Sequence, residues 1–180
     1  KFCTFCIVPF TRGRERSRTI DNIVKEVEAC IEQGFIEVTL LGQNVNSYRT
    51  PHGEFPELLE SVSKIKGLKR LRYTSPHPRD IDDHLLEVMQ KNKNICNHIH
   101  LPLQAGSDRI LKRMNRTYSK KEFLDLVVKI KKYLPDCSIT TDIIVGFPGE
   151  TEEEFLDTLD VAEQVMFDNS FMFEYSPRPG

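Results

Sequence analysis

Apolar residues recur along this chain at two spacings, one typical of helices and one typical of buried strands. The first helical face consists of Ile20, Ile23, Val24, Val27 and Ile31. The mostly apolar run 36–41 follows at once and ends at Gly42. A short run of this kind is typical of a strand covered on both faces in a parallel sheet. The two patterns continue to alternate to the end of the sequence.

Residues that begin helices frame the predicted segments. Thr19 can cap the first helix. Ser119 with Glu122, and Thr151 with Glu154, match the capping box that starts many helices. The predicted helices cover residues 20–31, 56–65, 82–90, 109–114, 119–134 and 151–165, and the predicted strands cover residues 36–41, 68–73, 98–103, 138–145 and 171–175.

Helices that alternate with strands predict an α/β fold with a parallel sheet and right-handed crossovers. The sheet is either open and doubly wound or curved into all or part of a barrel, and the pattern alone leaves both arrangements open. In either arrangement, ligands bind at the carboxyl ends of the strands. The segments that follow each strand are therefore the candidates for a binding site.

The chain has 180 residues, 39% of them hydrophobic, and no long apolar run. We therefore expect one soluble domain over residues 1–180 and no membrane contact. A first residue other than Met, no leader sequence and an uncapped end predict a natural protein that is longer at both ends. The formal net charge of -2 gives no overall attraction to nucleic acid. An RNA-binding role would depend on local basic segments or on further domains.

Five cysteines, an odd number without secretory features, favour a reducing interior over a disulfide framework. We expect a cytoplasmic protein, with an organelle left open. Cys3 and Cys6 form a C-x-x-C pair that suits one metal or cluster, or a redox dithiol. A zinc half-site and two buried thiols also remain open, although no second pair completes a zinc site. The other cysteines are interpreted as ordinary buried thiols: Cys30, Cys96 and Cys137.

The residues around Cys3 and Cys6 narrow the possible functions more than the cysteine pair alone. Cys3-Thr4-Phe5-Cys6 matches the end of the motif C-x3-C-x-aromatic-C, and an arginine-rich segment follows at residues 7–18. Further distinctive segments are 41–48 (LGQNVNSY), 74–78 (TSPHP), 100–107 (HLPLQAGS), 114–116 (MNR) and 141–150 (TDIIVGFPGE). Together these residues resemble the radical S-adenosylmethionine (radical SAM) methylthiotransferases over essentially the whole chain. Residues 41–48 resemble the branch that acts on N6-isopentenyladenosine in tRNA.

The resemblance implies a partial TIM-like barrel of the (β/α)6 type whose first strand precedes this sequence. It also implies two cofactors, a 4Fe–4S cluster and S-adenosylmethionine. The cluster ligands would be Cys3, Cys6 and a third cysteine two positions before Lys1, which leaves one iron open for S-adenosylmethionine. The electron that cleaves the sulfonium would come from the reduced cluster.

The resemblance further implies partners and domains outside this sequence. The product would carry a methylthio group on carbon 2 of the anticodon-adjacent adenosine, so the partner would be tRNA through its anticodon stem-loop. An amino-terminal domain would hold a second 4Fe–4S cluster, and a carboxyl-terminal domain would help to bind RNA. Electrons would come from a donor such as a flavodoxin or ferredoxin. We expect a monomer, and this part of the chain alone would be inactive.

Several candidate cofactor-binding residues follow predicted strands. By resemblance, Gln43 and Asn44 hold the methionine amino group, although Asn44 also suits a turn. Ser75 and Gln104, at the ends of the next two strands, suit ribose or carboxylate contacts. Phe5 could pack against the adenine or serve as a core aromatic.

The remaining candidates lie later in the chain. Arg116 could pair with the cofactor carboxylate through its planar fork or remain exposed. Ile144 and Val145, with Gly146, resemble the apolar shelf under adenine in this superfamily. Glu150 lies one position beyond the acid of the common superfamily pattern, so we assign it no role. No catalytic residue is assigned.

Two further groups have competing interpretations. His77 either belongs to the site or shapes a rigid loop between two prolines, and His98 with His100 are interpreted as structural residues on one strand face. The alternating arginines either meet an RNA backbone or form a solvated loop in which Glu15 is salt-bridged. These arginines are Arg12, Arg14, Arg16 and Arg18.

Two other functions stay open at this point. One is a methylthiotransferase with another acceptor, either a threonylcarbamoyl adenosine or a ribosomal protein. The other is a non-catalytic module that binds metal or RNA through the C-x-x-C pair and the arginines.

Overall fold

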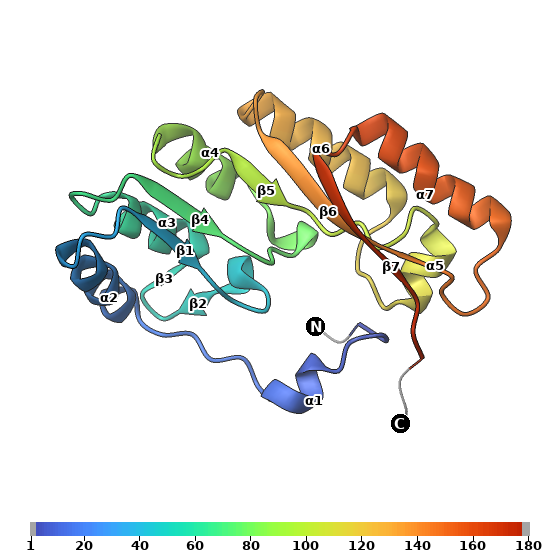
Figure 1. Cartoon of the computed structure of the whole chain (residues 1–180), viewed down its shortest axis with the longest axis horizontal. Helices are drawn as coiled ribbons and strands as arrows, with labels where there is room; N and C mark the ends of the chain where they lie inside the picture. Colours follow the sequence, from blue (N-terminus) through green and yellow to red (C-terminus); the bar gives the residue numbers. More distant parts are fainter. Residues whose placement is uncertain (1–2, 178–180) are drawn as a thin grey trace. The chain divides into compact units, whose positions relative to one another are not determined.

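The computed structural model describes residues 3–177, which fold into two compact units (Figure 1). The first unit comprises residues 3–15, 101–129 and 139–177, and the second comprises residues 16–100 and 130–138. Each unit combines helices with parallel strands, so the predicted α/β class is confirmed.

The second unit is built around the parallel pair β1 (Glu37–Leu40) and β4 (Arg70–Tyr73), in which Val38 is opposite Leu71. Leu71 and the α3 residue Leu59 are fully buried, which places the core of this unit between the strands and their helices. The other elements of the unit are α2 (Ile20–Glu32), η1 (Val45–Ser47), β2 (Arg49–Thr50), β3 (Gly53–Glu54), α3 (Phe55–Ser63), η2 (Pro78–Asp80), α4 (Asp83–Lys91) and β5 (His98–His100).

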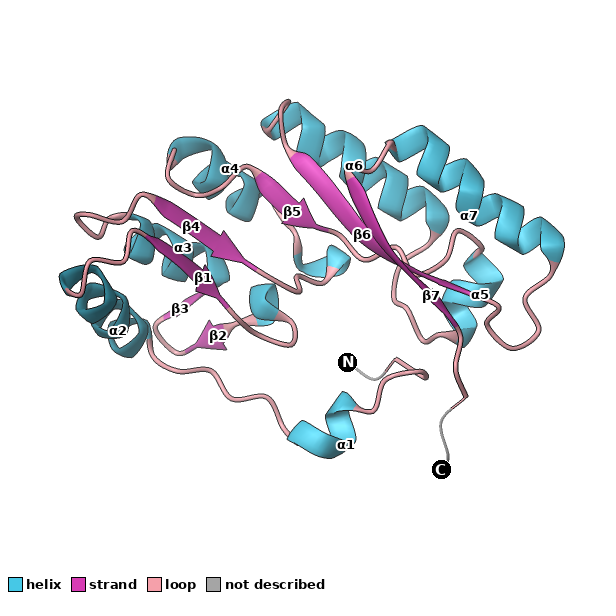
Figure 2. Cartoon of the chain, viewed as in Figure 1, coloured by secondary structure: helices cyan, strands magenta, loops and turns pink. Residues whose placement is uncertain are grey.

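The first unit is built around the parallel pair β6 (Ser138–Val145) and β7 (Asn169–Glu174). Ile139, Thr141 and Ile143 of β6 are buried and alternate with half-exposed residues. Figure 2 shows α6 and α7 running alongside these strands. The helices of this unit are α1 (Val8–Arg12), α5 (Asp108–Arg113), α6 (Lys120–Tyr133, which continues into the second unit) and α7 (Glu152–Val165).

The predicted helix starts are confirmed by hydrogen bonds. The Thr19 side chain accepts from the Asn22 amide. Thr151 and Glu154 form a reciprocal capping box at the start of α7. Ser119 and Glu122 do the same for α6, since each backbone amide donates to the other side chain. These bonds satisfy amides that have no partner within the first helical turn.

Several of the shortest elements escaped prediction, among them α1 and the hairpin of β2 and β3. The helix α1 has only five residues and none of them is buried, so it has no amphipathic pattern to detect. It also places Arg12 in a helix, where a continuous loop was expected. The hairpin of β2 and β3 consists of two residues in each strand, which is too short for an alternating pattern.

The predicted strand 98–103 was too long, since β5 ends at His100. Beyond that point, Gln104 has a φ of 70° and Ser75, after β4, has a φ of 56°. Left-handed backbone is uncommon for residues other than glycine and often marks functional positions. Both residues were predicted site residues.

Among the described residues, no helix has the length and apolar character needed to cross a membrane.

Candidate functional site

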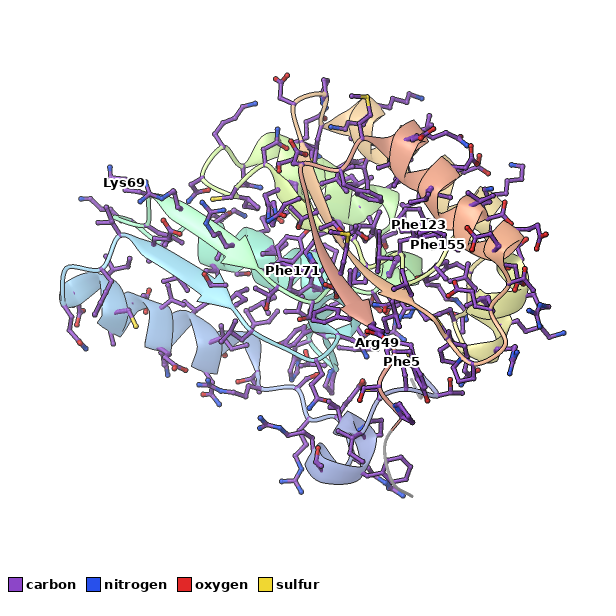
Figure 3. The ribbon with its side chains drawn as sticks, turned by 45° about the vertical axis from the view of Figure 1, so that its right-hand side comes forward. Phe5, Arg49, Lys69, Phe123, Phe155 and Phe171 are labelled. Carbon is purple, nitrogen blue, oxygen red and sulfur yellow. The ribbon has the colours of Figure 1, made fainter. Side chains whose placement is uncertain are left out.

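The two cysteines of the C-x-x-C pair lie at the ends of a tight turn. The Cys6 amide donates to the Cys3 carbonyl at 3.1 Å, so the chain reverses over Thr4 and Phe5 (Figure 3). Both thiols are half-buried and neither forms a disulfide. The turn therefore presents two free thiols, three positions apart in the sequence, at the first and last residues of one short loop.

The cysteine turn is anchored to the end of α5. The Thr4 amide donates to the Met114 carbonyl at 3.1 Å, and its hydroxyl donates to the Arg113 carbonyl at 3.0 Å. These carbonyls belong to the last helical turn, where intrahelical donors are missing. Sequence reasoning missed this role of Thr4, because nothing in the motif distinguishes it from any other spacer residue.

Arg116 is held beside Cys3 by several contacts. One terminal nitrogen, Nη1, lies 3.4 Å from the Cys3 sulfur, and the other, Nη2, donates to the Pro102 carbonyl at 3.2 Å. The Nε atom donates to the Tyr118 hydroxyl at 2.9 Å. Of the two interpretations of Arg116, the exposed arginine is therefore wrong, since the residue is half-buried and its planar fork fixes a positive charge next to the Cys3 thiol.

The charge states of Arg116 and Tyr118 follow from their burial and from the charges around them. Burial works against the charge on Arg116, but Tyr118 and Cys3 outweigh it and raise the pKa of the guanidinium above its ordinary value. Burial also raises the pKa of Tyr118 to about 12, although Arg116 opposes that shift. Arg116 therefore stays positive and Tyr118 stays neutral at physiological pH. The Tyr118 hydroxyl also lies within hydrogen-bond distance of the Pro102 and Leu103 carbonyls, at 2.7 and 2.9 Å.

Gln104 pairs with β6 through its backbone and has an unsatisfied side-chain oxygen. Its amide donates to the Asp142 carbonyl at 2.8 Å, and its carbonyl accepts from the Ile144 amide at 2.9 Å. Only 6% of the residue is exposed, yet its Oε1 atom has no hydrogen-bond partner among the described residues. A buried acceptor without a partner is costly, and a ligand hydroxyl or amine would satisfy it.

The carboxylate of Glu150 binds the backbone of the turn that follows β6. Glu150 Oε2 accepts from the amides of Gly146 and Phe147, at 2.6 and 3.2 Å, and therefore fixes the turn that follows Ile144 and Val145. The other oxygen, Oε1, is buried and has no partner among the described residues. Sequence reasoning assigned Glu150 no role, and the structure gives it a positioning one.

An aromatic face next to Ile144 was also missed. Ile144 pairs in register with Phe173 of β7, and Asp142 pairs with Phe171 (Figure 3). Phe171 and Phe173 are 54% and 55% exposed. Neighbouring residues of paired strands share a face, so Ile144 and Phe173 lie side by side on one face of the β6–β7 pair.

In the second unit, the loops after β1 and β4 are tied together. The Val45 amide donates to the Ser75 carbonyl at 3.3 Å. The Asn46 side chain bonds both backbone groups of His77, accepting from its amide at 2.7 Å and donating to its carbonyl at 2.9 Å. Asn44 and Ser75 therefore lie next to one contact between two strand ends. Asn46, which sequence reasoning overlooked, fixes this contact.

The histidines have structural surroundings. His77 is buried, and its Nδ1 atom accepts from the Arg79 amide at 3.3 Å, which fits the loop-shaping interpretation. His98 and His100 are half-buried on either side of buried Ile99, as the predicted alternation requires. Of the three other cysteines, Cys137 is buried, whereas Cys30 and Cys96 are only half-buried.

The described residues bring the candidate residues together in two groups. The first unit joins Cys3, Phe5, Cys6 and Arg116 at the cysteine turn, and backbone hydrogen bonds join Gln104 to Asp142 and Ile144 of β6. The second unit holds Asn44 next to Ser75, whereas Gln43 is exposed and forms no hydrogen bond with the described residues of this unit.

The donor set fits an iron–sulfur cluster as two of three ligands. Among residues 3–177, no group of three His, Cys, Asp or Glu could hold a metal ion, so within these residues Cys3 and Cys6 have no third side-chain donor beside them. Thiolates are the usual ligands of such clusters, and the guanidinium of Arg116 lies 3.4 Å from the Cys3 sulfur. The unsatisfied Oε1 atom of Gln104 fits a polar ligand such as S-adenosylmethionine.

Comparison with known proteins agrees with this geometry. The family model described as the radical SAM superfamily matches residues 1–162. Curated relatives named tRNA-2-methylthio-N(6)-dimethylallyladenosine synthase are 57% identical in Acetivibrio thermocellus and 54% in Lachnoclostridium phytofermentans, over 99% of this chain. This chain covers 38% and 40% of those relatives, so it spans about two fifths of their length.

Solved structures share the fold at low sequence identity. Streptococcus suis SuiB, bound to its precursor peptide SuiA, matches 97% of this chain and 36% of its own with a TM-score of 0.67 and 15% identity. Coproporphyrinogen III oxidase (HemN) from Escherichia coli matches 99% of this chain and 42% of its own, with a TM-score of 0.65 and 18% identity. With the family match over most of the sequence, the conclusion is that this chain belongs to the radical SAM superfamily, whose members use a 4Fe–4S cluster and S-adenosylmethionine.

Proposed function

We propose that this chain is the radical SAM core of a methylthiotransferase that adds a methylthio group to carbon 2 of N6-isopentenyladenosine in tRNA. One observation carries the proposal. The cysteine turn held beside Arg116 occurs in a sequence that is 57% identical, over 99% of its length, to a curated enzyme of that name. We further propose that the substrate is the anticodon stem-loop.

Cys3 and Cys6 are the proposed cluster ligands, together with a cysteine two positions before Lys1. When bound, the cluster and S-adenosylmethionine supply the radical chemistry of the superfamily. The Thr4 bonds to the end of α5 hold the cysteine turn in place for this task. The fixed positive charge of Arg116 lies 3.4 Å from the Cys3 sulfur and would attract a carboxylate of the cofactor.

Gln104 and the end of β6 are the proposed cofactor contacts of the first unit. The unsatisfied Oε1 atom of Gln104 would accept a hydrogen bond from a ribose hydroxyl. Ile144 and Val145 would form an apolar surface for the adenine, on a turn fixed by Glu150. Phe5, next to the ligands, would pack against the same base.

Gln43, Asn44 and Ser75 are proposed to bind the same cofactor, Gln43 and Asn44 through its amino group. The position of these residues supports the proposal, because ligands bind at the carboxyl ends of parallel strands in α/β folds. The left-handed backbone of Ser75 and the Asn46 clamp next to Asn44 agree with a fixed binding loop.

We also propose how this chain serves the whole protein. Residues 1–180 would be the core domain, an amino-terminal domain would carry a second 4Fe–4S cluster, and a carboxyl-terminal domain would bind RNA. The protein would act as a cytoplasmic monomer and take electrons from a flavodoxin or ferredoxin.

The test is a nucleoside measurement on the complete protein. The protein is reconstituted anaerobically with iron and sulfide and incubated with S-adenosylmethionine, a reductant and tRNA that carries isopentenyladenosine. Mass spectrometry of the digested tRNA should show 2-methylthio-N6-isopentenyladenosine, and the Cys6→Ala variant should form none. A methylthio group found only on threonylcarbamoyladenosine or on a ribosomal protein would refute the proposed acceptor.

A further inference from the structure

The short helix α1 presents an aromatic ring that the chain itself does not cover. Phe10 is 82% exposed, and Ile7 at the start of the helix is 44% exposed. The helix, labelled α1 in Figure 1, has no buried residue, and residues 10–19 are all exposed. A single exposed apolar residue is ordinary on a protein surface. What sets Phe10 apart is its rigid support and its charged neighbours.

The backbone around Phe10 is fixed at both ends of the helix. Pro9 occupies the first turn, where its restricted φ suits a helix. The Gly13 amide donates to the Pro9 carbonyl at 3.2 Å, with Gly13 at a φ of 71°. The Thr11 hydroxyl donates to the Val8 carbonyl at 3.2 Å. The ring is therefore held on a defined turn rather than on a loose loop.

Arginines follow this ring at alternate positions. Arg18 is engaged, since it forms an ion pair with Glu26 and donates to the Asn22 carbonyl at 3.4 Å. Within residues 3–177, the side chains of Arg12, Arg14 and Arg16 form no hydrogen bond or ion pair, and all three residues are exposed. The segment is thus locally basic in a chain whose formal net charge is -2.

We propose that Phe10 stacks on an unpaired base of the RNA substrate while Arg12 and Arg14 bind the flanking phosphates. This inference rests on the proposed function for the identity of the RNA. Single-stranded RNA loops are recognised by stacking on aromatic rings, and arginines contribute most of the affinity through phosphates. Phe10 is four residues from the cluster ligand Cys6 in the same unit, so RNA bound here is delivered next to the cysteine turn.

The charges favour RNA over an apolar protein surface as the occupant. An apolar partner covering Phe10 would also bury guanidinium groups without counter-charges, which is costly. Phosphates would satisfy these groups, and a base would cover the ring. Both chemical features of the segment are then used by one ligand.

The experiment measures binding of a fluorescein-labelled anticodon stem-loop RNA by the complete, cluster-reconstituted protein. Fluorescence anisotropy gives the dissociation constant at several salt concentrations. Phe10→Ala should weaken binding about ten-fold with an unchanged salt slope, since stacking is worth about 1–3 kcal/mol per base. Phe10→Trp should restore it. The logarithm of the association constant falls linearly with the logarithm of the salt concentration. Arg12→Gln and Arg14→Gln should each make this slope less steep by about 0.7.

Matched controls use exposed residues of the second unit. Phe35 is 57% exposed without flanking arginines, and Lys66 is an exposed cation. Phe35→Ala and Lys66→Gln should leave RNA affinity and its salt slope unchanged. If Phe35→Ala and Lys66→Gln weaken RNA binding as much as the variants of Phe10, Arg12 and Arg14, the effect is not specific to α1 and the inference is overturned.

Two outcomes separate this inference from the proposed function. Wild-type RNA affinity in both Phe10→Ala and the double variant of Arg12 and Arg14 would overturn the inference, as would reduced affinity that is accompanied in every variant by loss of the protein's compact elution in gel filtration. S-adenosylmethionine cleavage to 5'-deoxyadenosine without RNA should be unaffected by Phe10→Ala. If RNA binding depends on Phe10 but no methylthiolated nucleoside forms, the inference stands and the proposed function fails.

Discussion

Single residues decide whether the cysteine turn can hold a ligand. Arg116 contacts Cys3, Pro102 and Tyr118 at once, so its position depends on all three. The chemistry at this turn therefore depends on a supporting residue, Tyr118, that belongs to none of the motifs noticed in the sequence. Supporting residues of this kind hold functional side chains at the geometry that binding needs.

Tyr118→Phe should lower the free energy of unfolding by about 1–3 kcal/mol, because the Pro102 and Leu103 carbonyls lose a buried donor. Urea denaturation measures the effect. Tyr175→Phe is the matched control, since no hydrogen bond of its hydroxyl occurs among the described residues. Equal stability of the two variants would contradict the role given to the Tyr118 hydroxyl.

A second residue-scale prediction concerns acid stability. Arg109, with the Thr151 amide, lowers the pKa of Glu154 to about 2, against an ordinary value of about 4.3. Because the folded-state pKa is the lower one, the contribution of Glu154 is complete above about pH 4.3 and is lost as the pH falls to about 2. In acid titrations followed by circular dichroism, Glu154→Gln should lose less stability in this window than the wild type. A parallel loss would contradict the assignment.

At the scale of elements, the close packing of the loop after β5 against α7 limits what the chain tolerates. An added Cβ at Gly106 would lie 2.3 Å from the Asp157 carbonyl oxygen and 2.5 Å from the Thr158 Cα atom. The Gly106 amide also donates to the Thr158 hydroxyl at 2.8 Å. Backbone atoms cannot rotate away as a side chain can, so α7 itself would have to move.

Gly106→Ala should therefore lower the free energy of unfolding by about 1–3 kcal/mol or more. Gly13→Ala is the comparison, because its added Cβ meets no atom within 4 Å and reports only the strain of a φ of 71°. Thermal denaturation should rank Gly106→Ala as the less stable variant. The reverse order would show that α7 adapts without cost.

Element type and order could be predicted from the sequence, and the reasons are local. Capping residues such as Thr19 and Thr151 act within one helical turn, so their signal is contained in a few neighbouring residues. The helix α1 and the hairpin of β2 and β3 were missed because neither has a buried face or a sufficient length. The site was predictable where a residue directly follows a strand, as for Gln104, but the long-range contacts of Thr4, Asn46 and Tyr118 leave no local pattern.

At the scale of the whole molecule, family membership and local geometry support one another. The radical SAM match covers residues 1–162, and the cysteine turn offers two sulfur ligands beside a fixed cation. The chain spans about two fifths of the curated relatives it matches, so the remaining ligand and the RNA-binding parts are proposed to lie elsewhere in the protein. The central claim is that Cys3 and Cys6 are cluster ligands.

That claim is tested most directly by the cluster content of cysteine variants of the complete protein. After anaerobic reconstitution, iron and sulfide analysis with electron paramagnetic resonance of the reduced protein should show loss of one 4Fe–4S signal in Cys3→Ala and Cys6→Ala. In the wild type, the signal that the two variants lose should shift when S-adenosylmethionine is added. Cys30→Ala, Cys96→Ala and Cys137→Ala should retain the wild-type signal. Stoichiometric zinc without that cluster, or an unchanged signal in the Cys3 and Cys6 variants, would contradict the claim.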